Sequence, residues 1–461
     1  MRPFLFLLAI FMVTKVRGLC TEMPTYFKGE HVIAVTIFFL ALLFRFWYLN
    51  ELVIYDPIRG DAISYVQYSV NMLDHGVFSR SKIVPPTPDS YWAPGYPAFI
   101  VVSSQIGGLF NADTYDAVLS IQALLGALTT LLTWLVGRKF MGVRAAGIAS
   151  IISLLSPHMT TLGGYFLTET LFCFLLVLSV YFFSLYLESQ KYLWGLGCML
   201  CFAAAYFVNP VILFAPLLLL VVTAIKEHDL HKNKLLVLSL FYLVFVGGWS
   251  LRGMITVSDD SPSSSDRVFT NLVIGSHADY HEIWRDNPRN PDNPATVDRA
   301  AFSGSYSLFL EAFAGRIADK PFHYLKWYLW DKPKLLWDWD ILVGHGDIYV
   351  FPVASSIYFK SHFAIATVAL MKGLHPLLFL CALGGAGVAI RQLWKADSGL
   401  LPAALMLIVV YVSAVYVVLQ SEPRYSIPLR PEMYLLSVYC MSHVLRYVSG
   451  RVRMARAKAN A

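Results

Sequence analysis

Residues 31–49 read HVIAVTIFFLALLFRFWYL, and residues 56–65, a short distance beyond, read DPIRGDAISY. The first stretch is apolar and long enough to cross a bilayer, which takes about 20 residues. The second stretch places the carboxylate of Asp61 directly outside the end of that span. A carboxylate in this place is the kind of group that an enzyme needs for proton transfer at a membrane surface.

The composition of the whole chain indicates a polytopic membrane protein. Hydrophobic residues make up 57% of the 461 residues and charged residues 14%, and the mean hydropathy is +0.57. A chain this apolar is excluded as a single soluble domain. Its net charge of +6 is too small to indicate nucleic-acid binding. We therefore expect membrane lipids as partners and no nucleic acid.

Hydropathy predicts an all-α bundle of about ten spans. The predicted spans are His31–Leu49, Tyr115–Val136, Ala145–Met159, Thr170–Leu187, Tyr192–Val208, Val211–Ile225, Leu235–Leu251, Leu374–Ile390, Leu400–Leu419 and Ile427–Leu445. The apolar run Tyr96–Phe110 has only about fifteen residues, which is short for a crossing. We predict that it forms a surface or re-entrant helix, begun by the turn Pro94-Gly95-Tyr96-Pro97.

The basic residues orient these spans. If Tyr96–Phe110 does not cross, then Arg138, Lys139 and Arg144 fall on the same side as the other basic connections and the basic C-terminal tail. The positive-inside rule makes that side the cytoplasm. Four segments then share the outer compartment, and they are Asn50–Asn111, Thr160–Glu169, Arg252–Lys372 and Gln420–Tyr425.

The same scheme divides the chain into five parts. They are a cytoplasmic N-terminal segment (1–30), an N-terminal transmembrane module (31–251) with the first outer loop (50–111), a large outer loop (252–372), C-terminal transmembrane helices (373–448) and a basic cytoplasmic tail (449–461). Translation from Met23 is an open alternative for the start. Within the large outer loop, we expect residues 258–294, rich in Ser, Asp, Asn and Pro, to be irregular, and residues 319–330 to form amphipathic helix at the membrane interface.

Charged residues at the outer ends of the spans are the candidate site. Glu169 stands at the mouth of a span, where a carboxylate is costly unless it is wet, paired or functional. Spacing alone favours Asp61 as a helix N-cap over a catalytic base. Arg252 and Arg424 carry the planar guanidinium that binds phosphate well, although Arg424 could equally pair with Glu422 or contact lipid headgroups. Acids and arginines on one face suggest group transfer from a phosphate ester, with a carboxylate as base.

A divalent cation is a weaker prediction. His345 lies among Asp338, Asp340 and Asp347, all suitable ligands, but a polar turn flanked by glycines is the favoured interpretation. Asp61 and Glu169 are the other candidate metal ligands.

The chain resembles the GT-C superfamily of polytopic glycosyltransferases, of the protein O-mannosyltransferase and lipid A aminoarabinose transferase type. The resemblance rests on Gly60-Asp61 with Tyr65, Gly76-Val77-Phe78, Pro94-Gly95-Tyr96-Pro97, Leu167-Thr168-Glu169, Trp249-Ser250-Leu251-Arg252 and Glu422-Pro423-Arg424-Tyr425. It implies a GT-C helix bundle with outer juxtamembrane helices. It also implies transfer of a sugar from a polyprenyl phosphate to an acceptor hydroxyl on the outer face, with inversion.

The resemblance also assigns roles to residues. Asp61 would be the general base, and Arg424, with Arg252, would hold the lipid phosphate. Glu169 would orient the acceptor or the sugar, or help to hold a cation. Tyr65, Tyr96 and Tyr425 would contact the sugar or simply pack. The family often has a second acid beside the first-loop aspartate, whereas this chain has Ala62, which puts a metal held by paired acids in doubt. Many members have an arginine before the proline of a later span, whereas this chain has Asn209, so a phosphate or sugar contact at that position is not transferred.

Two other classes stay open from the sequence. A surface-polysaccharide polymerase or ligase would also use a large outer loop with arginines, and a lipid-linked glycan flippase or transporter would share the spans. The absence of an Asn-x-Ser/Thr sequon favours a bacterial inner membrane with the site facing the periplasm. Neither the sugar nor the acceptor, whether lipid, glycan or protein, can be predicted.

Overall fold

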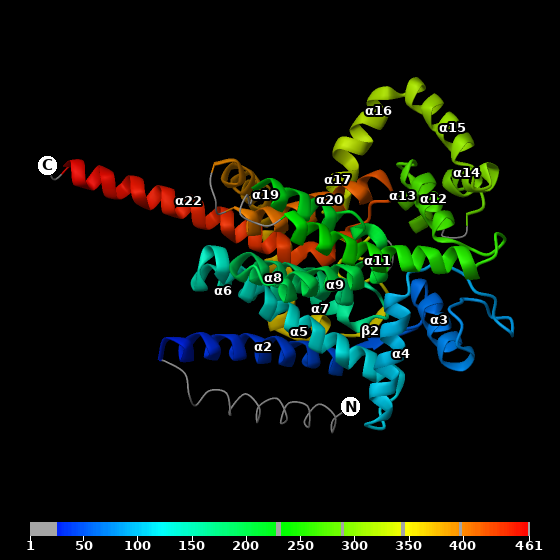
Figure 1. The fold of residues 1–461 in the computed structure, drawn as a ribbon, viewed down its shortest axis with the longest axis horizontal. Helices are drawn as coiled ribbons and strands as arrows, with labels where there is room; N and C mark the ends of the chain where they lie inside the picture. The colour runs from blue at the N-terminus through cyan, green and yellow to red at the C-terminus, as the bar shows by residue number, and fades with distance from the viewer. Residues whose placement is uncertain (1–24, 227–231, 287–289, 343–345, 396–398, 460–461) are drawn as a thin grey trace.

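The computed structural model describes residues 25–226, 232–286, 290–342, 346–395 and 399–459. Its long helices run side by side along the longest axis of the molecule (Figure 1). The start of α2 and the end of α22 lie at one end of this bundle, and α3 and α4 lie at the other. The predicted all-α membrane bundle is confirmed.

Each predicted span corresponds to a helix. These helices are α2 (Thr25–Glu51), α5 (Thr114–Met141), α6 (Val143–Leu155), α8 (Glu169–Ser189), α9 (Tyr192–Val208), α10 (Ala215–Lys226), α11 (Lys232–Thr256), α19 (His362–Lys395), α20 (Leu400–Val418) and α22 (Arg430–Ala459). Within the described ranges, six helices are long and apolar enough to cross a membrane, and a seventh is counted if the pair Val143–Leu155 and Pro157–Gly164, bent by 57°, is one span. The total of about ten spans stays a prediction.

The core of the bundle is built around α5, which packs against α2, α4, α6 and α8. The helices α19 and α22 cross closely at Gly385, where a Cβ atom would lie 2.1 Å from the carbonyl oxygen of Leu436. Small residues allow such close approach between membrane helices. The helix α19 begins at His362, well before the predicted Leu374, and contains Pro376.

Short elements cover the end of the bundle that the sequence predicts to face the outer compartment. They are α3 (Asp61–His75), α4 (Gly95–Gly108), α7 (Pro157–Thr161), η1 (Leu162–Gly164), η2 (Pro210–Ile212), α21 (Pro423–Ser426) and η4 (Ile427–Leu429). The predicted short helix after Pro94 is found as α4, which runs across the direction of the long helices (Figure 1). A departure from a purely helical fold is the two-stranded antiparallel sheet of β1 (Val53–Ile54) and β2 (Val353–Ser355), which joins the first outer loop to the large one.

The large outer loop is mostly helical. It contains α12 (Ser264–Gly275), α13 (Tyr280–Asp286), α14 (Pro294–Phe302), α15 (Tyr306–Asp319), α16 (Pro321–Lys326), the π-turn η3 (Trp327–Asp331), α17 (Lys332–Leu336) and α18 (Ile357–Lys360). The expected irregular segment 258–294 was therefore wrong. The reason is a capping box, in which Ser263 and Asp266 satisfy each other's backbone N–H groups and start α12.

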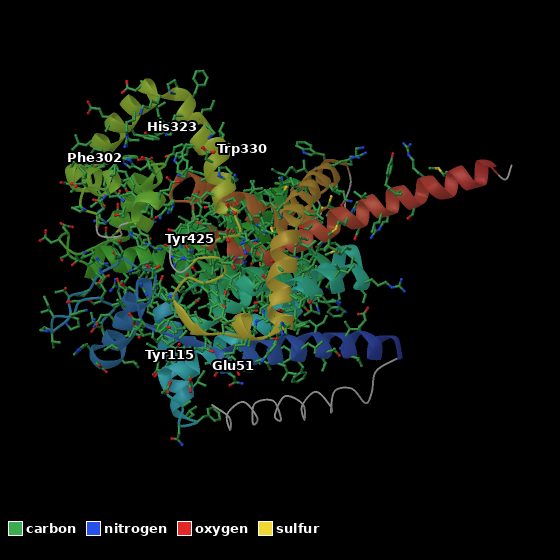
Figure 2. The ribbon with its side chains drawn as sticks, turned by 180° about the vertical axis from the view of Figure 1, so that it is seen from behind. Glu51, Tyr115, Phe302, His323, Trp330 and Tyr425 are labelled. Carbon is green, nitrogen blue, oxygen red and sulfur yellow. The ribbon has the colours of Figure 1, made fainter. Side chains whose placement is uncertain are left out.

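The helices α14, α15 and α16 form an arm that stands away from the bundle (Figures 1 and 2). The predicted helix over residues 319–330 is interrupted, because α15 ends at Asp319 and Pro321 starts α16. Phe322, Leu325 and Trp330 are exposed on this arm. Their apolar surface agrees with the predicted place at the membrane interface, which stays a prediction.

Candidate active site

Arg424 joins two carboxylates from distant parts of the chain. Its Nη2 atom lies 3.0 Å from Oδ2 of Asp61, and its Nε atom lies 3.3 Å from Oε1 of Glu169. The side chains of Arg424, Asp61 and Glu169 are 14%, 33% and 8% exposed, so the contact with Glu169 is the more deeply buried of the two. The fold thus brings together three of the residues that the sequence selected.

Both carboxylates that contact this guanidinium belong to the first residue of a helix. Asp61 is the first residue of α3 and follows Gly60, which has a φ of +57°. Gly60, not Asp61, is the N-cap, and it has no side chain to cap the helix. The N-cap interpretation of Asp61 was therefore wrong, because its side chain pairs with Arg424 instead. Glu169 is the first residue of α8.

The turn before Glu169 is fixed by a buried amide. Gln122 donates hydrogen bonds from Nε2 to the carbonyl oxygens of Gly163 and Tyr165, at 3.1 and 2.9 Å. The hydroxyl of Tyr96 donates to Oε1 of the same side chain at 3.0 Å. Tyr96 is fully buried and is absent from the cavity lining described below, so the structure places it behind the site.

The remaining predicted residues are divided between the site and its support. Tyr65 packs edge to face on Trp92, with ring centroids 4.9 Å apart, and Tyr425 stacks on Tyr416 at 4.8 Å. Both Tyr65 and Tyr425 line the cavity. Arg252 does not, because its guanidinium donates to the carbonyl oxygens of Asp89 and Phe78, at 2.7 and 3.2 Å. Arg252 ties the first outer loop to α11.

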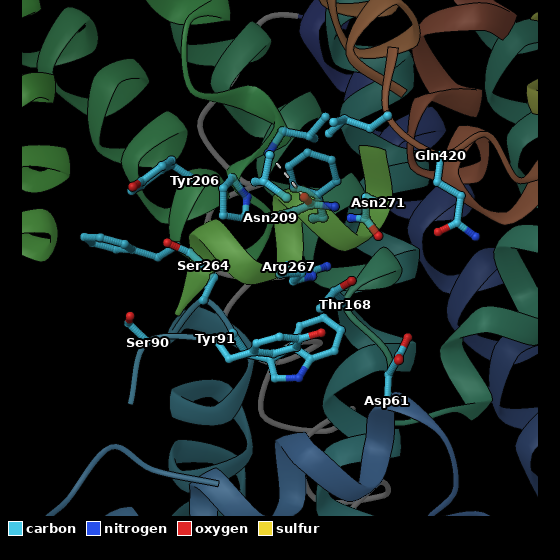
Figure 3. Close-up of a pocket in the computed structure, with 18 of the residues that line it drawn as sticks. Asp61, Ser90, Tyr91, Thr168, Tyr206, Asn209, Ser264, Arg267, Asn271 and Gln420 are labelled. Atoms are coloured by element: carbon cyan, nitrogen blue, oxygen red, sulfur yellow. Dashed lines mark hydrogen bonds between the residues drawn. The ribbon is translucent and has the colours of Figure 1, made fainter. Parts of the chain in front are cut away.

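A cavity of about 1180 Å³ opens beside the Arg424 cluster. Segments from all four predicted outer regions line it, including Asp61, Glu169, Arg424 and, from the large loop, Arg267. Figure 3 shows Asp61 and Arg267 among the side chains around this space. Its volume suits a substrate larger than a monosaccharide alone, since small-molecule sites are typically about 300–1,000 Å³.

Glu422 adds a third acid to the cavity wall. It is 5% exposed and accepts a hydrogen bond at 2.9 Å from the amide of Gln420. Burial raises the pKa of Glu422 to about 7, with Arg424 acting against this shift and Asp61 adding to it. Glu422 can therefore be neutral near neutral pH, which limits the negative charge around Arg424.

The large outer loop holds the segment that leads to Arg424. Lys332 donates from Nζ to the carbonyl oxygens of Gly275 and Leu419, at 3.0 and 2.7 Å. Lys332 is fully buried, and burial lowers its pKa to about 7. The helices approach so closely here that a Cβ atom on Gly275 would lie 1.6 Å from the oxygen of Leu419. The Nε2 atom of His281 adds a contact of 3.0 Å to the carbonyl oxygen of Ser421.

Arg267 is the site residue that the sequence analysis missed. It lies on α12, and its guanidinium carbon is 3.8 Å from the centroid of the Trp92 ring. The sequence predicts an irregular segment here, and such a segment gives no reason to place Arg267 at the site. The capping-box pattern of Ser263 and Asp266, followed by apolar residues, was the signal that could have revealed the helix.

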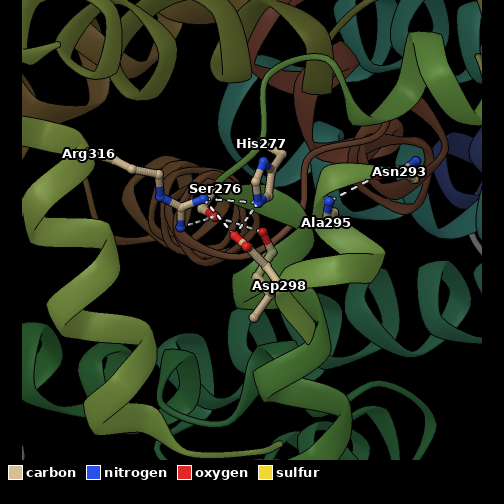
Figure 4. Close-up of polar contacts among 7 residues, drawn as sticks. Ser276, His277, Asn293, Ala295, Asp298 and Arg316 are labelled. Atoms are coloured by element: carbon tan, nitrogen blue, oxygen red, sulfur yellow. Dashed lines mark hydrogen bonds and ion pairs between the residues drawn. The ribbon is translucent and has the colours of Figure 1, made fainter. Parts of the chain in front are cut away.

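A second polar cluster lies in the outer loop and has a structural role. Arg316 and His277 both contact Oδ2 of Asp298, each at 2.8 Å, and Arg316 also donates to Ser276 at 3.3 Å (Figure 4). The hydroxyl of Ser276 itself donates to the carbonyl oxygen of Val273. These contacts join α12, α14 and α15, and Ser276 is not oriented as a nucleophile.

The candidate metal ligands are not gathered into a site by the described residues. His345 lies outside them. Asp61 and Glu169 both face the guanidinium of Arg424. Among the residues that the structure describes, no group of three His, Cys, Asp or Glu side chains is arranged to hold a metal ion.

The comparisons with known proteins agree with this architecture. Residues 93–250 match the sequence model of the dolichyl-phosphate-mannose-protein mannosyltransferase family. The oligosaccharyltransferase AglB from Archaeoglobus fulgidus, solved with an inhibitory peptide and a dolichol-phosphate, is 14% identical with a TM-score of 0.50, over 95% of this chain and 52% of that chain. ArnT from Cupriavidus metallidurans, solved with undecaprenyl phosphate, is 14% identical with a TM-score of 0.48, over 94% of this chain and 64% of that chain. No curated protein matches the chain in sequence.

The helix bundle and the short helices over the end that carries the site define a polytopic membrane protein with the GT-C fold. The match of residues 93–250 to the mannosyltransferase family model, about a third of the chain, agrees with the resemblance to GT-C glycosyltransferases stated from the sequence motifs. The chain spans only 52% and 64% of the two solved proteins. The match to AglB, at a TM-score of 0.50 and 14% identity, shows a shared fold alone and leaves the reaction to be argued from the site.

Proposed function

We propose that the protein is a membrane glycosyltransferase that moves a sugar from a polyprenyl phosphate to an acceptor hydroxyl, with inversion. The reaction takes place at the periplasmic face of a bacterial inner membrane. The observation that carries this proposal is the pairing of Arg424 with Asp61 and Glu169 in the wall of the large cavity. The solved GT-C proteins were captured with undecaprenyl phosphate and dolichol-phosphate, which supports a lipid phosphate as the carrier.

The chemical step needs a base and a leaving group on opposite faces of the sugar. The acceptor oxygen attacks the anomeric carbon as the bond between that carbon and the phosphate oxygen breaks. The acceptor proton passes to the carboxylate of Asp61, and the phosphate leaves with the bonding electrons on its lipid. Asp61 is the better exposed of the two acids, at 33%, so an acceptor can reach it from the cavity.

Arg424 and Glu169 prepare Asp61 for this step. The guanidinium fixes the direction of the Asp61 carboxylate through a charge-assisted contact of 3.0 Å. Glu169, largely buried at the start of α8, holds the other side of the guanidinium. Positioning of this kind lowers the entropy cost of bringing the base to the acceptor.

Aromatic side chains line the space where the sugar would lie. Tyr65, Trp92, Tyr416 and Tyr425 all contribute to the cavity wall. Flat aromatic surfaces suit the apolar faces of a sugar ring, and their hydroxyl groups can hydrogen-bond its edges. The residues of the cavity wall indicate no preference for one sugar, so hexose and pentose donors both fit the proposal.

The test compares Asp61→Asn with Asp56→Asn, a matched control at an exposed aspartate of the same loop that is absent from the cavity lining. Both variants are reconstituted in vesicles with a panel of polyprenyl-phosphate hexoses and pentoses, and the release of polyprenyl phosphate is measured. We expect Asp61→Asn to lose a factor of about 10²–10⁴ in rate and Asp56→Asn to keep the wild-type rate. Full turnover in Asp61→Asn would refute the role of the base, and sugar-lipid translocation without transfer would favour a flippase.

A further inference from the structure

Three arginines line the cavity, and their surroundings differ. Arg424 is paired with both Asp61 and Glu169. Arg59 is exposed, with its guanidinium 5.8 Å from the centroid of the Phe351 ring. Arg267 is half-buried and, among the residues that the structure describes, has no carboxylate partner. Neither Arg59 nor Arg267 forms a salt bridge to a carboxylate within the described part of the chain, and Arg267 is the less exposed of the two.

The two carboxylates around Arg424 disfavour the binding of a further anion to this arginine. Two carboxylates already face this single guanidinium. A phosphate that approached Arg424 would meet the repulsion of Asp61 and Glu169 in a partly buried place, where charges are weakly screened. It would also have to displace contacts of 3.0 and 3.3 Å that already exist.

Arg267 is presented in a form that suits a phosphate. Its guanidinium carbon lies 3.8 Å from the centroid of the Trp92 ring. Stacking on an aromatic face holds the guanidinium by its flat side, through a cation–π contact. The N–H groups lie at the edge of the guanidinium plane, so the stacked arginine can bind two oxygens of one phosphate.

Arg267 is also close to the reacting groups. The Trp92 ring over which its guanidinium lies is 4.9 Å from the ring of Tyr65, centroid to centroid. Tyr65 follows Asp61 by one turn of α3. A phosphate on Arg267 would therefore lie within the same part of the cavity as the proposed base.

We infer that the phosphate of the lipid-linked donor binds the guanidinium of Arg267, stacked on Trp92, while Arg424 stays paired with Asp61 and Glu169. This assignment rests on the proposed function, and it moves the phosphate contact from Arg424 on α21 to the outer-loop helix α12. The chemical group that Arg267 would recognise is the phosphate ester of the donor. The consequence is that α12 is part of the donor site, so the large outer loop contributes directly to substrate binding.

The test measures binding of farnesyl phosphate and of farnesol to the full-length protein in nanodiscs of zwitterionic lipid. Farnesol keeps the isoprenoid chain and lacks the phosphate, so the ratio of the two affinities reports phosphate recognition. The variants are Arg267→Gln, Arg267→Lys and the matched control Arg299→Gln, at an exposed arginine outside the cavity lining. Thermal unfolding of each variant shows that it is folded.

We expect Arg267→Gln to weaken farnesyl phosphate binding about tenfold to hundredfold, as for loss of a charged hydrogen bond, and to leave farnesol binding unchanged. Arg267→Lys keeps the charge and should show a smaller loss, and Arg299→Gln should behave as the wild type. Inorganic phosphate should compete in the wild type if the phosphate alone is recognised.

The outcomes separate this inference from the proposed function. Wild-type protein that binds farnesol as well as farnesyl phosphate would count against a lipid-phosphate substrate altogether. A preference for farnesyl phosphate that stays at the wild-type level in a folded Arg267→Gln variant would overturn the assignment to Arg267 and leave the proposed function standing.

Discussion

Replacing Arg424 by glutamine removes the one cation between two acids, and the two acids should respond differently. The Glu169 side chain is 8% exposed and cannot recover its lost partner from water. Breaking a buried ion pair on one side costs about 3–5 kcal/mol because a buried charge is left uncompensated. The Asp61 side chain is 33% exposed, so solvent screens it, and its pairing contributes at most about 1 kcal/mol.

The cost of Arg424→Gln should therefore come mainly from Glu169. We expect Arg424→Gln to lower the midpoint of thermal unfolding by several degrees. The double variant Arg424→Gln with Glu169→Gln should regain most of that loss, whereas Arg424→Gln with Asp61→Asn should not. Lowering the pH should also reduce the loss in Arg424→Gln, because protonation of Glu169 removes the uncompensated charge.

The assay is thermal unfolding of purified protein in one detergent at one scan rate, because a protein of this size does not unfold in two states. Transfer activity of the same samples separates stability from function, since the stabilised double variant lacks Arg424 and should stay inactive. Unfolding of Arg424→Gln at the wild-type temperature, or a rescue by Asp61→Asn as full as that by Glu169→Gln, would show that the buried pair with Glu169 does not dominate the stability of the cluster.

Two further predictions concern the residues around this cluster. Burial raises the pKa of Glu422 to about 7 from 4.5, so the folded protein keeps a proton that the unfolded chain releases between these values. Stability should therefore fall by up to about 3 kcal/mol as the pH rises through that window, and unfolding at pH 5 and pH 8 should show that Glu422→Gln loses this dependence; an unchanged pH profile would contradict it. Gly275→Ala places a Cβ 1.6 Å from the oxygen of Leu419 and should loosen the outer loop, detected as faster limited proteolysis. The control Gly315→Ala, with nothing within 4 Å, should be neutral or slightly stabilising, and equal proteolysis of both would refute the clash.

The helical bundle could be predicted because each span is a continuous apolar run. The cluster of Asp61, Glu169 and Arg424 could be predicted in part, because charges at span ends are rare and the positive-inside rule places these three on one side. Their direct pairing could not be foreseen, since it depends on the turn at Gly60 and on the path of the chain between α20 and α22.

Side-chain positions outside the predicted spans are harder to predict from the sequence, because no membrane dictates the residue pattern there. Arg252 has the same position relative to a span end as a phosphate-binding arginine would have, yet it binds two backbone carbonyls. Only the folded path of the first outer loop supplies those acceptors. Arg267 was missed because turn-forming residues around α12 concealed a helix whose start is set by local side-chain bonds.

The contacts of Lys332 determine which substitutions the protein tolerates at positions 275 and 419. Its ammonium group binds oxygen atoms of the main chain at Gly275 and Leu419. Every residue offers a carbonyl oxygen, so the side chain at position 419 can drift in evolution without loss of the anchor. Gly275 has no such freedom, because the space beside it is already filled. The path of the chain to Arg424 is therefore encoded by a lysine and a glycine that belong to a different part of the protein.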